Sequence, residues 1–77
     1  MSEFTADVLF HINETLDEQS ISKVEYDMAF HKGVRTACVN CKNPHLMLVD
    51  YDPMEVKALA LLGSLKTRGL HAEMVGF

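Results

Sequence analysis

The sequence predicts an α+β fold in which a four-stranded antiparallel sheet carries two helices on one face. Runs that alternate apolar and polar residues indicate strands, and two stretches with helical spacing indicate helices. Glycine, proline and asparagine separate these segments in the order βαββαβ. All 77 residues, 1–77, are expected to form one domain, because no stretch is polar or repetitive enough to be a linker.

The first strand and the first helix are predicted at the start of this order. A strand is expected over 7–13, where every second residue is apolar. Thr15 and Glu18 match a capping box, so the helix should begin there and run to about Lys32. Gly33 is the expected left-handed residue just past its end.

A hairpin is predicted in the middle of the chain. Segments 34–41 and 46–51 are extended and rich in apolar residues. The segment between them, Lys42-Asn43-Pro44-His45, contains an Asn-Pro pair that is typical of turns. We therefore expect these two strands to be adjacent and antiparallel.

The second helix and the last strand complete the order. Asp52 is the expected helix cap, with Pro53 at the first helical position. Gly69 should end this helix, and 70–75 alternates again as a strand. The arrangement is the ferredoxin-like split βαβ fold, an open-faced sandwich. It brings the loop before helix one, the hairpin and the loop after helix two to one end of the sheet.

Composition and charge exclude several classes of function. A net charge of −4 and only seven Lys and Arg residues argue against a nucleic-acid surface, so protein or ion partners are expected. Two cysteines are too few for a disulfide scaffold, and 1–5 lacks a signal-peptide pattern, which favours the cytoplasm. The longest apolar run, 58–62, is far shorter than the ~20 residues that span a bilayer, so no membrane association is expected.

Structural residues along nearly the whole chain resemble those of the heavy-metal-associated domains of copper chaperones and metal-pumping ATPases. The likeness rests on Gly33-Val34, Val39-Asn40, Tyr51-Asp52-Pro53 and Arg68-Gly69-Leu70-His71-Ala72-Glu73. Members of that family bind a soft ion such as Cu(I) through a Met-x-Cys-x-x-Cys loop at the start of helix one.

Counting back from Gly33, the positions that match this loop are Thr15-Leu16-Asp17-Glu18-Gln19-Ser20, and both thiols are absent. Leu70 also replaces an aromatic residue that many members carry. The resemblance therefore implies the fold but not the family's usual metal transfer.

The acidic residues at this loop have two interpretations. Carboxylates at Asp17 and Glu18 complement the dipole of a first helical turn. Alternatively, Glu14, Asp17 and Glu18 are a site for a hard ion such as Ca²⁺ or Mg²⁺, although their spacing is not that of a known calcium loop.

Cys38, Cys41 and His45 form a Cys-x-x-Cys-x-x-x-His pattern at the hairpin, a possible half-site for zinc or copper. Strand alternation, however, predicts that Cys41 faces the helices as a small buried residue while Cys38 faces the open side. The two sulfurs then diverge, so neither chelation nor a disulfide is expected unless the strand has a bulge near Asn40.

His11 and His71 are expected on the open face of neighbouring strands, nearly opposite each other. Together they could make a pH-sensitive contact or bind an ion, or each could be a solvated surface residue. No nucleophile stands next to a base, and so small a chain cannot enclose a substrate pocket. We therefore expect no enzymatic activity.

The second helix is apolar on nearly every side. Its core stripe consists of Ala58, Leu61, Leu62 and Leu65. The further residues Val56, Leu59, Ala60 and Gly63 predict an interaction surface for a second copy or another protein, the alternative being a loosely amphipathic helix. The open sheet face, with Leu9, Leu48 and Val75, is a second candidate surface.

Two hypotheses follow from the sequence. The first is a small protein-interaction or regulatory module that keeps the heavy-metal-associated fold without its thiol loop and without a cofactor. The second is a metal-binding or metal-transfer domain that holds a copper or zinc ion at a relocated site, either Cys38, Cys41 and His45 or the pair His11 and His71.

Overall fold

The computed structural model describes residues 5–76 and confirms the predicted order of elements. Residues 1–4, most of the segment that lacks a signal-peptide pattern, and residue 77 lie outside the described part. The elements are β1 (Ala6–Ile12), α1 (Glu18–Ala29), β2 (Val34–Val39), β3 (Leu46–Tyr51), α2 (Ala58–Thr67) and β4 (Ala72–Gly76).

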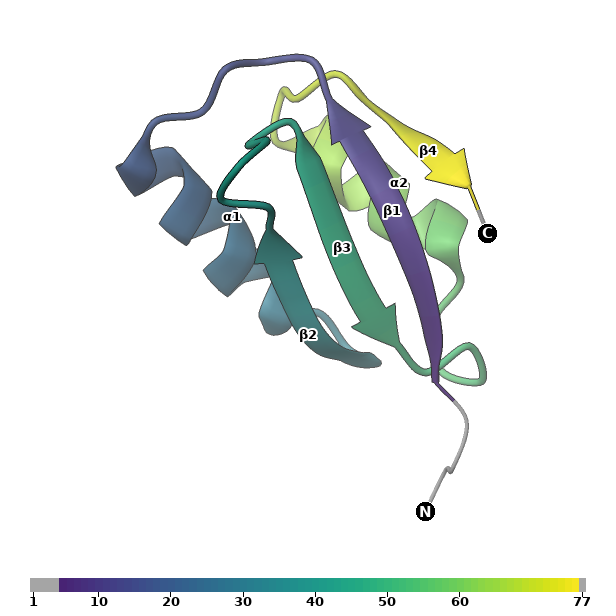
Figure 1. Cartoon of the computed structure of the whole chain (residues 1–77). Coiled ribbons are helices and arrows are strands. Elements are labelled where there is room, and N and C mark those ends of the chain that lie inside the picture. The colour runs from purple at the N-terminus through teal and green to yellow at the C-terminus, as the bar shows by residue number, and fades with distance from the viewer. Residues whose placement is uncertain (1–4, 77) are drawn as a thin grey trace.

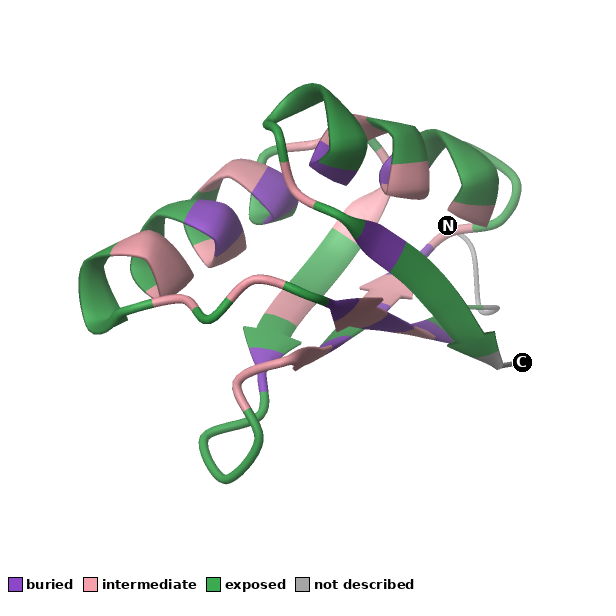
Figure 2. Cartoon of the chain, turned by 90° about the horizontal axis from the view of Figure 1, so that it is seen from above, coloured by how far each residue is buried: buried purple, intermediate pink, exposed green. Residues whose placement is uncertain are grey.

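The four strands form one antiparallel sheet in the order β2-β3-β1-β4 (Figure 1). Both helices pack on the same side of this sheet, as the view in Figure 2 shows. The strand order makes β2 and β4 the edges of the sheet. Among residues 5–76 no element covers the other side, so one whole face of the sheet is open. This is the ferredoxin-like fold that the sequence predicts.

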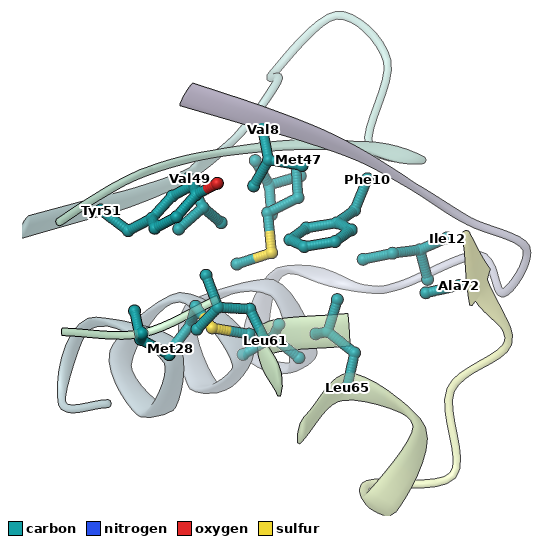
Figure 3. Close-up of a cluster of buried hydrophobic side chains, with 13 residues drawn as sticks. Val8, Phe10, Ile12, Met28, Met47, Val49, Tyr51, Leu61, Leu65 and Ala72 are labelled. Carbon is teal, nitrogen blue, oxygen red and sulfur yellow. The ribbon is translucent and has the colours of Figure 1, made fainter. Parts of the chain in front are cut away.

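The core lies between the sheet and the helices, and strand alternation decides which residues enter it. On the central strands every second residue is buried, because successive side chains point to opposite faces. Each helix adds one apolar stripe, with Leu61 and Leu65 of α2 completely buried (Figure 3). The fully buried large side chains are Val8, Phe10, Ile12, Met47, Val49, Leu61 and Leu65.

The first helix begins later than the predicted capping box. Its cap is Asp17, whose carboxylate accepts a hydrogen bond of 2.8 Å from the backbone N–H of Ser20. Thr15 stays in the loop, so the prediction of a cap there was wrong by two residues. Gly33 does adopt the predicted left-handed conformation, with φ of 87°.

The second helix also begins later than predicted, at Ala58 instead of at Asp52-Pro53. The backbone carbonyl of Asp52 accepts the N–H groups of Glu55 and Val56, which closes a turn. This turn buries Val56 against Gly33, where an added Cβ would lie 2.7 Å from a Val56 methyl carbon. Because Val56 packs against that glycine, the helix does not begin at Asp52-Pro53 but after this turn.

The end of the second helix agrees with the prediction at Gly69. Gly69 has φ of 87°, and its N–H and that of Leu70 bond back to the carbonyls of Lys66 and Leu65, a Schellman motif. Leu70 belongs to this cap, so β4 starts at Ala72 and not at residue 70. Among residues 5–76, no helix is long and apolar enough to cross a membrane.

Candidate functional site

The positions that match the family's thiol loop form a helix cap. The bond from Ser20 to Asp17 favours the ionised carboxylate, so it lowers the pKa of Asp17 below its ordinary value of 3.8. The backbone carbonyl of Asp17 accepts from Ile21 at 2.9 Å and so continues the helix. Asp17 is therefore used in the way that the capping interpretation predicts.

Glu14, the other acid near this loop, contacts the far end of the chain. Its carboxylate accepts from the backbone N–H of His71 at 2.8 Å and lies 2.5 Å from Nδ1 of the same residue. These hydrogen bonds to His71 lower the pKa of Glu14 below its ordinary value of 4.5. Glu14 thus ties the β1–α1 loop to the start of β4, a pairing between residues 57 apart that no local pattern reveals.

Only one of the two cysteines has the position that strand alternation predicts. β2 ends at Val39, so Cys38 points to the open face, paired with Leu48, while Cys41 lies in the loop beyond the strand. Cys41 is exposed, and its predicted burial toward the helices was wrong. The reason is Asn40, whose side-chain oxygen accepts from the N–H groups of Lys42 and Asn43 and turns the chain early.

A bulge near Asn40 would have allowed the two sulfurs to converge on one ion. The irregularity in β2 lies elsewhere, between Val34 and Thr36. Across residues 5–76 no group of three His, Cys, Asp or Glu side chains is arranged to hold a metal ion. Cys38 and Cys41 are free thiols on the hairpin that also carries His45, but the structure does not gather the three residues into one ligand set.

His45 is held by β1 instead of by the cysteines. Its Nδ1 lies 2.7 Å from the carbonyl oxygen of Ile12, so Nδ1 carries the proton, because a carbonyl can only accept. The ring stacks on His11, with centroids 5.8 Å apart and planes inclined by 15°.

The predicted pairing of His11 with His71 was wrong by two residues of register. His11 lies opposite Glu73, and His71 precedes β4, where its carbonyl accepts from Asn13 at 2.8 Å. The histidine neighbour of His11 is therefore His45, brought close by the hairpin.

The apolar surface predicted on helix two is present in part. Val56 is 9% exposed and belongs to the core, so its place in that surface was wrong. Leu59 is 67% exposed, and Ala60 and Gly63 are exposed beside it. Together with Met54, a side chain that the sequence analysis did not single out, Leu59 and Ala60 line a shallow groove of about 360 Å³.

The open face of the sheet carries an apolar row that crosses the strands. Cys38, Leu48 and Leu9 are direct neighbours on β2, β3 and β1. On β4 a bulge leaves Val75 unpaired between the partners of Phe10 and Leu9, and Val75 and Leu48 are 52% and 45% exposed. This set of four residues is called the apolar row below.

A second row runs parallel to the first and is acidic. Asp7 and Asp50 are direct neighbours on β1 and β3, and Thr36 continues the row on β2. One carboxylate oxygen of Asp50 is buried and accepts no hydrogen bond within residues 5–76. This acidic row was not predicted from the sequence, although alternation along the two strands places both aspartates on the open face.

Comparisons with known proteins agree with this architecture. No family model and no curated protein matches the sequence. Among solved structures, oxidized MerP from Ralstonia metallidurans CH34 is similar with a TM-score of 0.83 at 14% identity, over 95% of this chain and 100% of that one.

Two copper proteins are similar as well. A copper-bound variant of CopA from Bacillus subtilis has a TM-score of 0.78 at 21% identity, over 100% of both chains. The apo form of the copper chaperone of Enterococcus hirae has 0.78 at 19%, over 88% of this chain and 98% of that one. The chain therefore has the fold of the heavy-metal-associated domains.

Proposed function

We propose that this domain is a protein-interaction or regulatory module built on the heavy-metal-associated fold, without an enzymatic activity or a resident cofactor. The observation that carries the proposal is that Asp17 caps α1. At the position that the resemblance assigns to a metal-binding thiol, an aspartate caps α1 by accepting from Ser20. The side chain is already engaged in folding, and its oxygen ligands do not suit a soft ion.

The exposed apolar surface supports a binding role. Leu59 and Met54 on the helix side, and Leu48 and Val75 on the open face, are all large and exposed in a chain of 77 residues. Apolar side chains that gather in this way mark protein contacts more often than scattered exposed residues do. A protein partner or a second copy of the chain is the occupant that we propose, and two free cysteines support a reducing compartment such as the cytoplasm.

A gain-of-function variant tests this proposal directly. The double variant Asp17→Cys, Ser20→Cys restores two thiols at the matched positions of the loop. In a Cu(I) titration against a competing chelator, we expect this variant to bind one ion. The natural chain should bind none. Stoichiometric, chelator-resistant Cu(I) on the reduced natural chain would overturn the proposal.

A relocated metal site is the second candidate, with copper or zinc held by Cys38, Cys41 and His45. It is favoured by one observation: both thiols are exposed and free on the hairpin that also carries His45. His45 would offer Nε2, because its Nδ1 hydrogen is donated to Ile12. Elemental analysis and native mass spectrometry of the untagged, reduced protein test it. Bound metal that disappears in Cys38→Ser would favour this candidate over the first.

A further inference from the structure

We propose that the open face of the sheet is the docking surface of this module, and that its partner is a cationic amphipathic protein segment. Such a segment presents Lys or Arg beside aliphatic side chains. This inference rests on the proposed function and names the surface and the chemistry of the partner. It is carried by the apolar row, the acidic row beside it and the distribution of charge over the chain.

The apolar row supplies the contact area. Cys38, Leu48 and Leu9 adjoin one another across three strands, and Val75 extends the row to the fourth. No helix or loop among residues 5–76 covers this side of the sheet (Figure 2). A row of this kind fits the aliphatic side chains of a segment laid across the strands.

The acidic row supplies the charge preference. Its two aspartates, Asp7 and Asp50, lie on the open face. Glu73, the one other acidic residue of the strands, lies outside this row, opposite His11 on the same face. Arg35 is the single Lys or Arg in the strands, and it lies in the irregular part of β2, near Asp52 and Glu55 at the end of the sheet. The remaining cations are on the helices and loops.

Asp50 is the residue of the open face that we expect a cationic partner to stabilise most. It lies directly opposite Asp7, and like charges at directly opposed positions destabilise a sheet. One of its carboxylate oxygens is buried without a hydrogen bond in the described part of the chain, a costly state for a charged group. A Lys or Arg brought from outside to the pair Asp7 and Asp50 would offset the repulsion between the two carboxylates.

The same charges argue against a second copy packed face to face. Two open faces would bring the aspartates of both copies into one interface, and like charges there oppose association. The groove at Leu59 and Ala60 on the helix side is lined by one acid and one base, Glu55 and Lys57, so its charges do not favour a partner of one sign. Of the two surfaces, the open face is therefore the one whose charges favour a particular kind of partner, a cationic one.

Binding of designed peptides, measured by fluorescence anisotropy, tests the inference. The first peptide has about ten residues, a length that spans the sheet, with Leu and Lys at every second position so that both lie on one face of the extended peptide, and Ser at the positions between. One control peptide replaces Lys by Glu, and the other replaces Leu by Ser. We expect the Leu-Lys peptide to bind at least about tenfold more tightly than either control. Absence of binding, or equal binding of all three peptides, would overturn the inference.

Matched protein variants locate the surface. Asp7→Asn with Asp50→Asn should weaken the Leu-Lys peptide about tenfold at low salt. Glu18→Gln with Glu55→Gln, which removes the same charge elsewhere, should leave it nearly unchanged. Leu48→Lys should abolish binding, and Leu59→Lys, a change at an exposed leucine of α2, should not. Circular dichroism and thermal melting confirm that each variant is folded.

The two proposals fail in different ways. If Leu59→Lys abolishes peptide binding and Leu48→Lys does not, the domain still binds protein but the open face is the wrong surface. A loss in Glu18→Gln, Glu55→Gln equal to that in the aspartate variant would make the charge effect non-specific and would overturn the inference. A natural chain that binds Cu(I) stoichiometrically overturns the proposed function instead.

Discussion

The carboxylate of Glu25 on α1 accepts a hydrogen bond of 2.7 Å from the backbone N–H of Val39, the last residue of β2. β2 is an edge of the sheet, where backbone groups that the ladder does not use face outward. The contact joins the helix to this edge and occupies one such donor. It adds a polar contact to the apolar packing of Val24 and Met28, which holds α1 on the sheet.

Replacement of Glu25 by alanine should therefore destabilise the domain. Hydrogen bonds to charged groups contribute about 1.5–3 kcal/mol when buried, and this half-buried one should contribute about 1 kcal/mol. Urea unfolding followed by circular dichroism measures the loss. Glu25→Gln keeps an acceptor and should lose less, and equal stability of all three proteins would contradict the role of this bond.

Alanine at Gly33 should be more harmful than alanine at Gly69. Both glycines have φ of 87°, which costs a residue with a Cβ about 1–2 kcal/mol. At Gly33 the new Cβ would also lie 2.7 Å from Val56, whereas at Gly69 it meets nothing within 4 Å. The midpoints of thermal unfolding of Gly33→Ala and Gly69→Ala separate the two effects, and identical midpoints would show that Val56 gives way freely.

Stability should fall on the acid side of pH 5, approximately where carboxylates begin to take up protons. The folded pKa values of Glu14 and Asp17 are both below their ordinary values. Their contributions are thus present above those ordinary values and are lost as the pH falls through the folded ones. Urea midpoints at a series of acidic pH values measure this dependence.

Two isosteric variants check which groups cause it. Glu14→Gln and Asp17→Asn do not titrate, and asparagine still caps a helix well. Each should flatten the acid limb of the stability profile, and their effects should add because the two carboxylates have separate hydrogen-bond partners. An unchanged limb in both variants would assign the pH dependence to other carboxylates.

Two leucines on one helix should respond differently to truncation. Leu61 is completely buried, and Leu61→Ala should cost about 2–5 kcal/mol. Leu59 is 67% exposed, and Leu59→Ala should change the free energy of unfolding by less than about 0.5 kcal/mol. Chemical denaturation of both variants measures the difference, and a costly Leu59→Ala would mean that α2 is rotated or that its outer face is covered.

The elements and the core follow from patterns that extend over several residues, and these were predicted well. The period of two along 7–13 gave the buried side of β1, and the stripe through Leu61 and Leu65 gave the buried side of α2. The ends of elements depend on competition between single residues. Asp17 and Thr15 both suit a cap, and only the path of the loop decides between them.

The surroundings of the candidate site could not be predicted in the same way. Glu25 meets Val39, His45 meets Ile12, and Glu14 meets His71. Each pair joins distant parts of the chain, so its formation depends on the exact register and twist of the sheet. Cys41 illustrates the consequence, because the turn at Asn40 ends the strand before alternation can bury it.

The residue at position 17 can cap α1 or offer a thiol to a metal ion, but it cannot do both. A thiol there would offer a soft ligand, but it would give up the oxygen that accepts from Ser20 and holds the first turn of α1. A chain with aspartate at this position can therefore gain a thiol ligand there only by losing the hydrogen bond that caps α1. A bound ion would then have to supply the stability that the carboxylate now supplies, so folding of such a variant would depend on the metal supply.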